Sequence, residues 1–206
     1  MRDKNTKDKL LKAGLELFSE FGLEDTSTRM IAKKAGVNIA AIAYYFGGKE
    51  KLYERVSLML INHLKSLIQP ILTEIDSTID EMSISDARNI LLRLIKGISD
   101  ATQNPDIIKF ILLVEREQQE PTSVFKLIYD NFTAIIFKTI TKCLKKIAPD
   151  KSDLHYILVS QSLLSHATLF LAYKTNILDS LKLDSFSDKS HLIHNKLLEN
   201  HVLSFT

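Results

Sequence analysis

Apolar side chains recur every three to four positions along nearly the whole chain, and no stretch shows the sustained apolar and polar alternation of a half-buried strand. This pattern predicts an all-α fold of about nine helices. We place the helices, in approximate bounds, at residues 5–21, 28–36, 39–45, 49–70, 86–102, 106–118, 122–147, 153–173 and 187–203.

Residues that end or begin helices divide this pattern. Gly22, Gly36 and Gly47 each follow an apolar stripe, and glycine tolerates the left-handed backbone that ends many helices. Pro105 and Pro121 stand where a new helix can begin, because the first turn needs no donor at that position. The N-terminal helices are therefore short and closely spaced, whereas the later ones are long. Pro70 either kinks or ends the fourth helix.

The composition fits a globular protein: of 206 residues, 45% are hydrophobic and 25% are charged. The single cysteine, Cys143, excludes an intrachain disulfide, and the first residues lack the apolar stretch of a signal peptide. The most apolar stretch, residues 154–173, is interrupted by His155, Gln161 and His166, which argues against a membrane span. We therefore expect a cytoplasmic protein without a membrane partner.

Charge is distributed unevenly along the chain. Residues 1–55 carry 11 Lys and Arg against 8 Asp and Glu, whereas residues 56–206 carry 16 against 17. The positive excess lies where a polyanion such as DNA could use it. Because charge balance and helix length change together, we place a domain boundary within the fourth helix, between a domain of residues 1–55 and one of residues 56–206.

Two short helices joined at Gly36, with a third helix before them, have the proportions of a helix-turn-helix. Glycine lets the chain reverse without a Cβ clash, and Ile31, Val37, Ile42 and Phe46 can then form one small core. The spacing alone leaves open a helical hairpin that has no nucleic-acid partner.

The residues of this segment carry more information than its spacing. The run TSTRMIAKKAGVN, residues 26–38, followed by YYFGGKEKLY, residues 44–53, resembles the DNA-binding domain of TetR/AcrR-family transcriptional regulators. The resemblance covers about residues 10–60. It extends to the CecR-type subgroup through NIAAI at 38–42, FGGKE at 46–50, REQ at 116–118 and PT at 121–122.

The resemblance implies a fold and a function. The implied fold is an N-terminal three-helix helix-turn-helix DNA-binding domain, joined through a long helix to a C-terminal helical bundle for ligand binding and dimerisation. The implied protein is a homodimeric repressor that leaves its palindromic operator, a double-stranded DNA, when a small hydrophobic effector binds.

By this resemblance the DNA-contacting residues are Thr28, Arg29, Asn38, Ile39, Ala40, Ala41, Ala43, Tyr44, Tyr45 and Lys49. Thr28, Tyr44 and Lys49 can offer a hydroxyl, a phenol and an ammonium to phosphates. Each also has a purely structural interpretation, as a helix cap, a half-buried aromatic ring or a solvated lysine. The small apolar side chains of the third helix cannot make the paired hydrogen bonds by which Arg reads guanine. Sequence preference should then depend on Asn38, Arg29, thymine methyl contacts and DNA shape.

The resemblance places the ligand site among the C-terminal helices, where apolar walls carry a few polar groups. The candidate ligand residues are Phe110, Val114, Glu117, Phe125, Tyr129, His166 and Phe170. Plain core packing is the alternative for each of them. The resemblance also assigns the dimer contact to the helices at residues 153–173 and 187–203, with a monomer as the alternative.

Other chemistry finds little support in the sequence. His191, His194 and His201 lie on one side of the last predicted helix, but no cysteine or acidic residue stands at the spacing of a zinc site. No phosphate-binding glycine loop, G-x-S-x-G or H-E-x-x-H motif is present. We therefore expect no metal, no cofactor and no catalysis. A DNA-binding protein that acts through protein partners without a ligand stays open, as does a helical enzyme.

Overall fold

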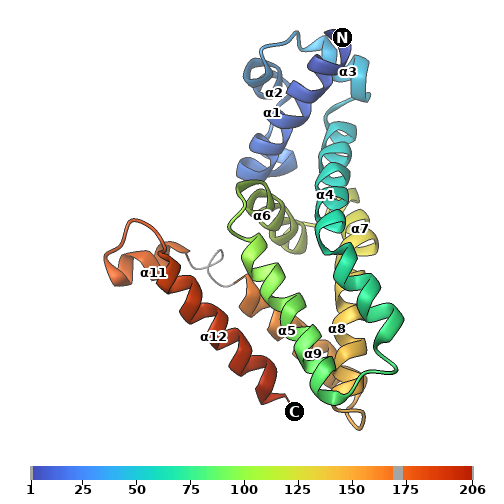
Figure 1. Ribbon diagram of the computed structural model, residues 1–206. Helices are drawn as coiled ribbons and strands as arrows, with labels where there is room; N and C mark the ends of the chain where they lie inside the picture. Colours follow the sequence, from blue (N-terminus) through green and yellow to red (C-terminus); the bar gives the residue numbers. More distant parts are fainter. Residues whose placement is uncertain (1, 169–173, 206) are drawn as a thin grey trace. The chain divides into compact units, whose positions relative to one another are not determined.

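The computed structural model describes residues 2–168 and 174–205, and every regular element within these ranges is helical (Figure 1). The predicted all-α class is confirmed. In chain order the helices are α1 (Arg2–Asp25), α2 (Thr28–Ala35), α3 (Ala40–Phe46), α4 (Lys49–Thr78), α5 (Ile84–Ala101), α6 (Pro105–Gln119), α7 (Ser123–Ile128), the π-helical η1 (Tyr129–Thr133), α8 (Ala134–Ile147), α9 (Asp153–Ala167), α11 (Lys174–Leu181) and α12 (Asp188–Ser204).

The predicted helices of the first half have the right order, and two of them are longer than predicted. Gly22 adopts φ 79° and breaks the helical backbone inside α1, but a further turn follows it up to Asp25. Of the two outcomes predicted for Pro70, a kink or an end, the structure excludes the end, because α4 continues to Thr78. Because Pro70 lies on an exposed side of the helix, water can satisfy the carbonyl group that loses its backbone partner.

The second half contains more helices than predicted. The continuous helix predicted for residues 122–147 is divided into α7, η1 and α8. The buried residues on either side of the π-helical turn, Val124, Ile128, Ile136 and Ile140, stay at multiples of four positions, so the apolar pattern shows no break there. The helix predicted for residues 153–173 is described as far as Ala167, and residues 169–173 lie outside the described ranges. The helix α11 was not predicted, since Leu178 is buried but Leu181 is exposed and no apolar stripe forms.

The chain divides into two compact units, each with its own core. The first unit contains residues up to 65 together with residues 105–133, and the second contains residues 66–104 together with residues from 134 onward. The first core includes Leu10, Phe18, Ile31, Ile42 and Leu52, all at most 1% exposed. The second includes Ile75, Leu91, Leu94, Leu163 and Leu198, again at most 1% exposed. The functional boundary near residue 55 stays a prediction.

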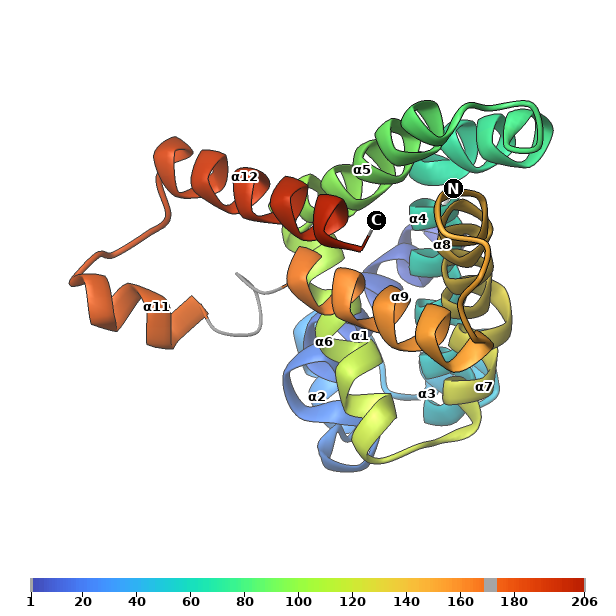
Figure 2. The ribbon, with the colours of Figure 1, turned by 90° about the horizontal axis from the view of Figure 1, so that it is seen from below.

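In the second unit α5 packs against α8, α9 and α12, and α9 also packs against α8 and α12 (Figure 2). Polar contacts fix the ends of this bundle. Lys142 on α8 places its Nζ 2.6 Å from Oδ1 of Asp76, near the end of α4. The Tyr156 hydroxyl donates to the carbonyl of Ala148 at 2.7 Å and thereby closes the connection between α8 and α9.

Candidate nucleic-acid interface

Local backbone contacts build the turn between α2 and α3. The Ser27 hydroxyl accepts a hydrogen bond from the Met30 amide at 3.2 Å and caps α2. Gly36 ends α2 with φ 65°, a conformation that a side chain would disfavour. The Asn38 side chain accepts from the Ala40 amide at 2.8 Å and so begins α3. The turn therefore depends on residues close in sequence, which explains why sequence patterns locate it well.

The helix α3 has one buried side and one exposed side. Ile42 is 1% exposed and belongs to the core, as its position in the pattern predicts. Ile39, Ala40, Ala43 and Tyr44 are exposed, and Tyr44 retains 79% of its accessible surface. The structure therefore brings these four predicted DNA-contacting residues onto one outward face.

Two other predicted residues on α3 lie at the edge of this face. Ala41 and Tyr45 are each half-buried. A substitution at Ala41 would therefore disturb packing as well as the outward surface, so Ala40 and Ala43 are the better positions at which to test DNA contact.

The predicted phosphate contacts lie at helix beginnings. Thr28 is the first residue of α2 and is half-buried, and the next residue, Arg29, is exposed. Lys49 is the first residue of α4, and its Nζ donates to the carbonyl of Leu23 at 2.7 Å. Lys49 thus ties the start of α4 to the end of α1, a role that the sequence did not reveal because the two residues are 26 positions apart.

Two lysines near the N-terminus, outside the set of DNA contacts that the resemblance implies, lie beside Tyr44. Lys4 and Lys7 on α1 line one open hollow together with Tyr44 and Tyr45. The Lys7 ammonium lies 5.6 Å from the centre of the Tyr45 ring, and the Tyr44 and Tyr45 rings meet edge to face at 4.8 Å. The hollow adds positive charge and hydrogen-bond donors next to the exposed face of α3.

A buried polar network joins α4 to α6 inside the first unit. The Tyr53 hydroxyl donates to Oε1 of Glu117 at 2.7 Å, and the two residues are 1% and 2% exposed. The Thr122 amide donates to Oε2 of Glu117 at 2.9 Å, and the Thr122 hydroxyl lies 2.8 Å from Oε1. Burial and the adjacent carboxylate raise the pKa of Tyr53, so the phenol stays protonated and keeps donating. These contacts occupy the carboxylate that was predicted to meet a ligand.

Next to this network, α6 also contacts α1. Arg116 donates from Nη2 to the carbonyl of Glu20 at 3.1 Å. A Cβ added to Gly22, which has a left-handed backbone, would lie 2.8 Å from the Arg116 side chain. The neighbouring Glu115 lies on the same helix, and burial raises its pKa. Glycine at position 22 is therefore favoured by its backbone conformation, and any larger residue would also have to displace the flexible Arg116 side chain.

The other predicted ligand residues are distributed over both units. Phe110 is 1% exposed and packs edge to face on Phe132. Phe125 stacks on Tyr129 with ring centres 6.2 Å apart, Tyr129 is 46% exposed, and Val114 is half-buried. His166 belongs to the second unit. Phe170 lies outside the described residues.

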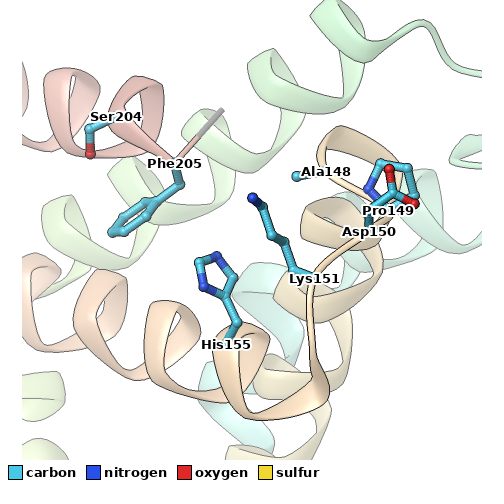
Figure 3. Close-up of a pocket in the computed structure, with 7 residues that line it drawn as sticks. All are labelled: Ala148, Pro149, Asp150, Lys151, His155, Ser204 and Phe205. Carbon is cyan, nitrogen blue, oxygen red and sulfur yellow. The ribbon is translucent and has the colours of Figure 1, made fainter.

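The hollow in Figure 3 is formed by other residues. It has a volume of about 390 Å³ and lies in the second unit, between the α8–α9 connection and the end of α12. Lys151, His155 and Phe205 project into it. Within the described ranges, no three His, Cys, Asp or Glu side chains are arranged to hold a metal ion. None of the helices that the structure describes is long and apolar enough to cross a membrane.

The helices α1 to α3, with the turn at Gly36 and the outward face of α3, have the arrangement of a helix-turn-helix DNA-binding domain. Residues 10–56 match the family model described as bacterial regulatory proteins, tetR family. The HTH-type transcriptional dual regulator CecR of Shigella flexneri is 26% identical over 98% of this chain and 92% of its own length. A probable HTH-type transcriptional regulator of Bacillus subtilis (strain 168), YttP, is 48% identical over 25% of each chain. Residues 10–56 thus carry a DNA-binding domain of the tetR-family type, and these relatives are named as transcriptional regulators.

Solved structures agree with this fold. The ketosteroid transcriptional regulator KstR2 of Mycobacterium tuberculosis matches 96% of this chain and 93% of its own, with a TM-score of 0.69 and 16% identity. AibR, solved in complex with isovaleryl coenzyme A and operator DNA, matches 94% of this chain and 96% of its own, with a TM-score of 0.69 and 12% identity.

Proposed function

We propose that this regulator is a cytoplasmic homodimeric repressor that binds a palindromic operator through α3 and leaves it when a small hydrophobic effector binds. The observation that carries the DNA-binding part is the outward face of α3, where small apolar residues stand beside the exposed Tyr44 on a capped helix-turn-helix. Small side chains allow the backbone to approach the bases closely and to touch thymine methyl groups.

Phosphate contacts would position this face on the duplex. Thr28 and Tyr44 each present a hydroxyl beside α3, and Lys4 and Lys7 add charge at the hollow that Tyr44 lines. Lys49 can contribute its charge to the same surface while its ammonium also holds the Leu23 carbonyl. Because phosphate contacts carry no sequence information, these residues should strengthen binding to all DNA alike.

The homodimer is supported by the exposed apolar residues of α9 and α12, the helices assigned to dimer contact by the family resemblance. Leu154 and Leu158 on α9 are 64% and 59% exposed, and Leu192 and Ile193 on α12 are 71% and 52% exposed. A monomer rarely leaves such a concentration of large apolar side chains in water. A second copy of the chain would cover them and would supply the second α3 that a palindrome needs.

The effector part of the proposal rests on the stacked pair Phe125 and Tyr129. Tyr129 is 46% exposed and presents both an aromatic face and a hydroxyl to a ligand. The solved complex of AibR with isovaleryl coenzyme A and operator DNA shows that a protein of this fold takes both kinds of partner. If effector and operator favour different conformations, each must weaken the binding of the other by the same factor.

Selection of DNA fragments from a random pool, followed by measurement of binding stoichiometry, tests this proposal. We expect a palindromic consensus that binds two chains per duplex. The variant Leu192→Lys should be a monomer by light scattering and should bind the palindrome about tenfold or more weakly, because each chain then brings only one reading head. The matched control is Leu112→Lys, on α6, where the leucine is 39% exposed. A monomeric wild-type chain that binds the palindrome tightly would contradict the proposal.

A further inference from the structure

Three histidines that play no part in DNA binding meet between α9 and α12 in the second unit. His166 Nδ1 lies 2.9 Å from His201 Nδ1, and His201 Nε2 lies 3.2 Å from the Ser162 hydroxyl. His194 is 1% exposed, with Nε2 2.8 Å from the His166 carbonyl and Nδ1 3.2 Å from the Ser99 hydroxyl on α5. Side-chain hydrogen bonds of this histidine cluster therefore join three helices.

These contacts limit the number of protons that the cluster can hold. A carbonyl oxygen only accepts, so His194 carries a proton on Nε2, whereas the Ser99 hydroxyl can either donate to Nδ1 or accept from it. Two ring nitrogens 2.9 Å apart share a single proton. If His166 and His201 were both charged, two N–H groups would point at each other. The contact between His166 and His201 as it stands therefore excludes the doubly charged pair.

The surroundings of His194 offer little compensation for a positive charge. Burial has the largest effect and lowers the pKa of His194; it outweighs the hydrogen bond to the His166 carbonyl, which raises the pKa, and the nearby His191 on α12 lowers it further. The Asp100 carboxylate on α5 acts in the opposite direction, but it also accepts a hydrogen bond from Asn195 at 3.5 Å. The net effect is a lowered pKa.

The pKa values of the two paired rings, His166 and His201, are lowered as well. Burial lowers the pKa of both His166 and His201, and the other two rings of the cluster lower that of His166 further. The acidic groups of the packed helices are already engaged: Glu199 on α12 pairs with Lys96 on α5 at 3.8 Å, and Asp153, in the first turn of α9, pairs with Lys145 on α8 at 2.9 Å.

We propose that the histidine cluster is an acid-sensitive latch, in which protonation releases α12 from α9 and α5. Well above pH 6.5 the rings are neutral in the folded and the unfolded chain, and the latch contributes its full stability. As the pH falls below this value, the unfolded chain takes up protons that the folded cluster cannot hold. For each histidine that stays neutral in the folded chain, the equilibrium constant for opening then rises tenfold for every unit by which the pH falls. The latch concerns a single chain and does not depend on the proposed dimer.

Hydrogen exchange of the full chain at pH 7.5 and pH 5.5, with EDTA present and rates corrected for intrinsic exchange, tests this latch. In the wild type we expect the opening constant of α12 amides to rise about tenfold or more at the lower pH. The double variant His194→Gln with His201→Asn keeps an amide group near the Nε2 position of His194 and near the Nδ1 position of His201, and neither new side chain titrates. It should lose most of this pH dependence, because His166 is the one member of the cluster that still titrates, whereas His155→Gln, elsewhere on α9, should keep it.

Equal pH dependence in the wild type and the double variant would overturn the proposal. If circular dichroism shows that the double variant does not fold, the histidine rings of the wild type are titrated by NMR instead. The latch requires the His166, His194 and His201 rings to titrate below the ordinary value of about 6.5. Titration of all three rings at or above that value would overturn the proposal as well.

Discussion

Removal of the Tyr53 hydroxyl in Tyr53→Phe tests the buried network between α4 and α6. The substitution keeps the ring, which meets Phe18 edge to face at 4.8 Å, and removes only the 2.7 Å hydrogen bond to Glu117. A hydrogen bond to a charged group contributes about 1.5–3 kcal/mol. Because the amide and hydroxyl of Thr122 still donate to the carboxylate, we expect a loss of about 1.5–2 kcal/mol in the free energy of unfolding.

The assay is urea unfolding followed by circular dichroism, extended to a double-mutant cycle with Glu117→Gln. The cycle should give a coupling of about 1 kcal/mol or more between the two side chains. The matched control is Tyr44→Phe, which removes a hydroxyl from a side chain that is 79% exposed and should change stability by less than about 0.5 kcal/mol. A Tyr53→Phe effect as small as that of the control, or a coupling near zero, would refute the reasoning.

Three further outcomes are expected. By thermal unfolding, Ile42→Arg should unfold the helix-turn-helix, whereas Ala43→Arg should leave stability within about 0.5 kcal/mol and change DNA binding, because only position 42 is buried. Gly22→Ala should lower the unfolding midpoint, since it strains a φ of 79° and meets Arg116 at 2.8 Å; an unchanged midpoint would contradict this. In a thiol-reagent assay Cys143 should react only on unfolding, because it is fully buried and burial raises its pKa to about 12; rapid native-state labelling would contradict this.

The helix-turn-helix could be predicted from the sequence because its determinants are local. The cap at Ser27, the left-handed Gly36 and the Asn38 side chain that accepts from the Ala40 amide all act on partners within four residues. The inward position of Ile42 follows from the apolar period of the helix. The division of residues 122–147 was missed because a π-helical turn disturbs that period too little.

Roles that depend on distant partners could not be predicted. Glu117 is a polar residue at the end of an apolar stretch, which suggested a ligand contact. Its carboxylate instead accepts a hydrogen bond from Tyr53, which is 64 positions away in the sequence. The family resemblance implies a phosphate contact for Lys49. Its hydrogen bond to the Leu23 carbonyl depends on how α1 and α4 pack, which the sequence does not reveal. The contact of His166 with His201, 35 positions apart, likewise becomes visible only once α9 and α12 are in place.

The central claim is that the outward face of α3 binds DNA, and a fluorescence anisotropy titration with Ala43→Asp tests it most directly. Ala43 is exposed, so the substitution should leave the fold and the urea midpoint unchanged while placing a carboxylate against the phosphates and base edges. We predict that the variant binds the selected operator at least about tenfold more weakly than the wild type, while Lys9→Gln, at an exposed position of α1, reduces binding far less. Operator binding by Ala43→Asp with wild-type affinity would contradict the account.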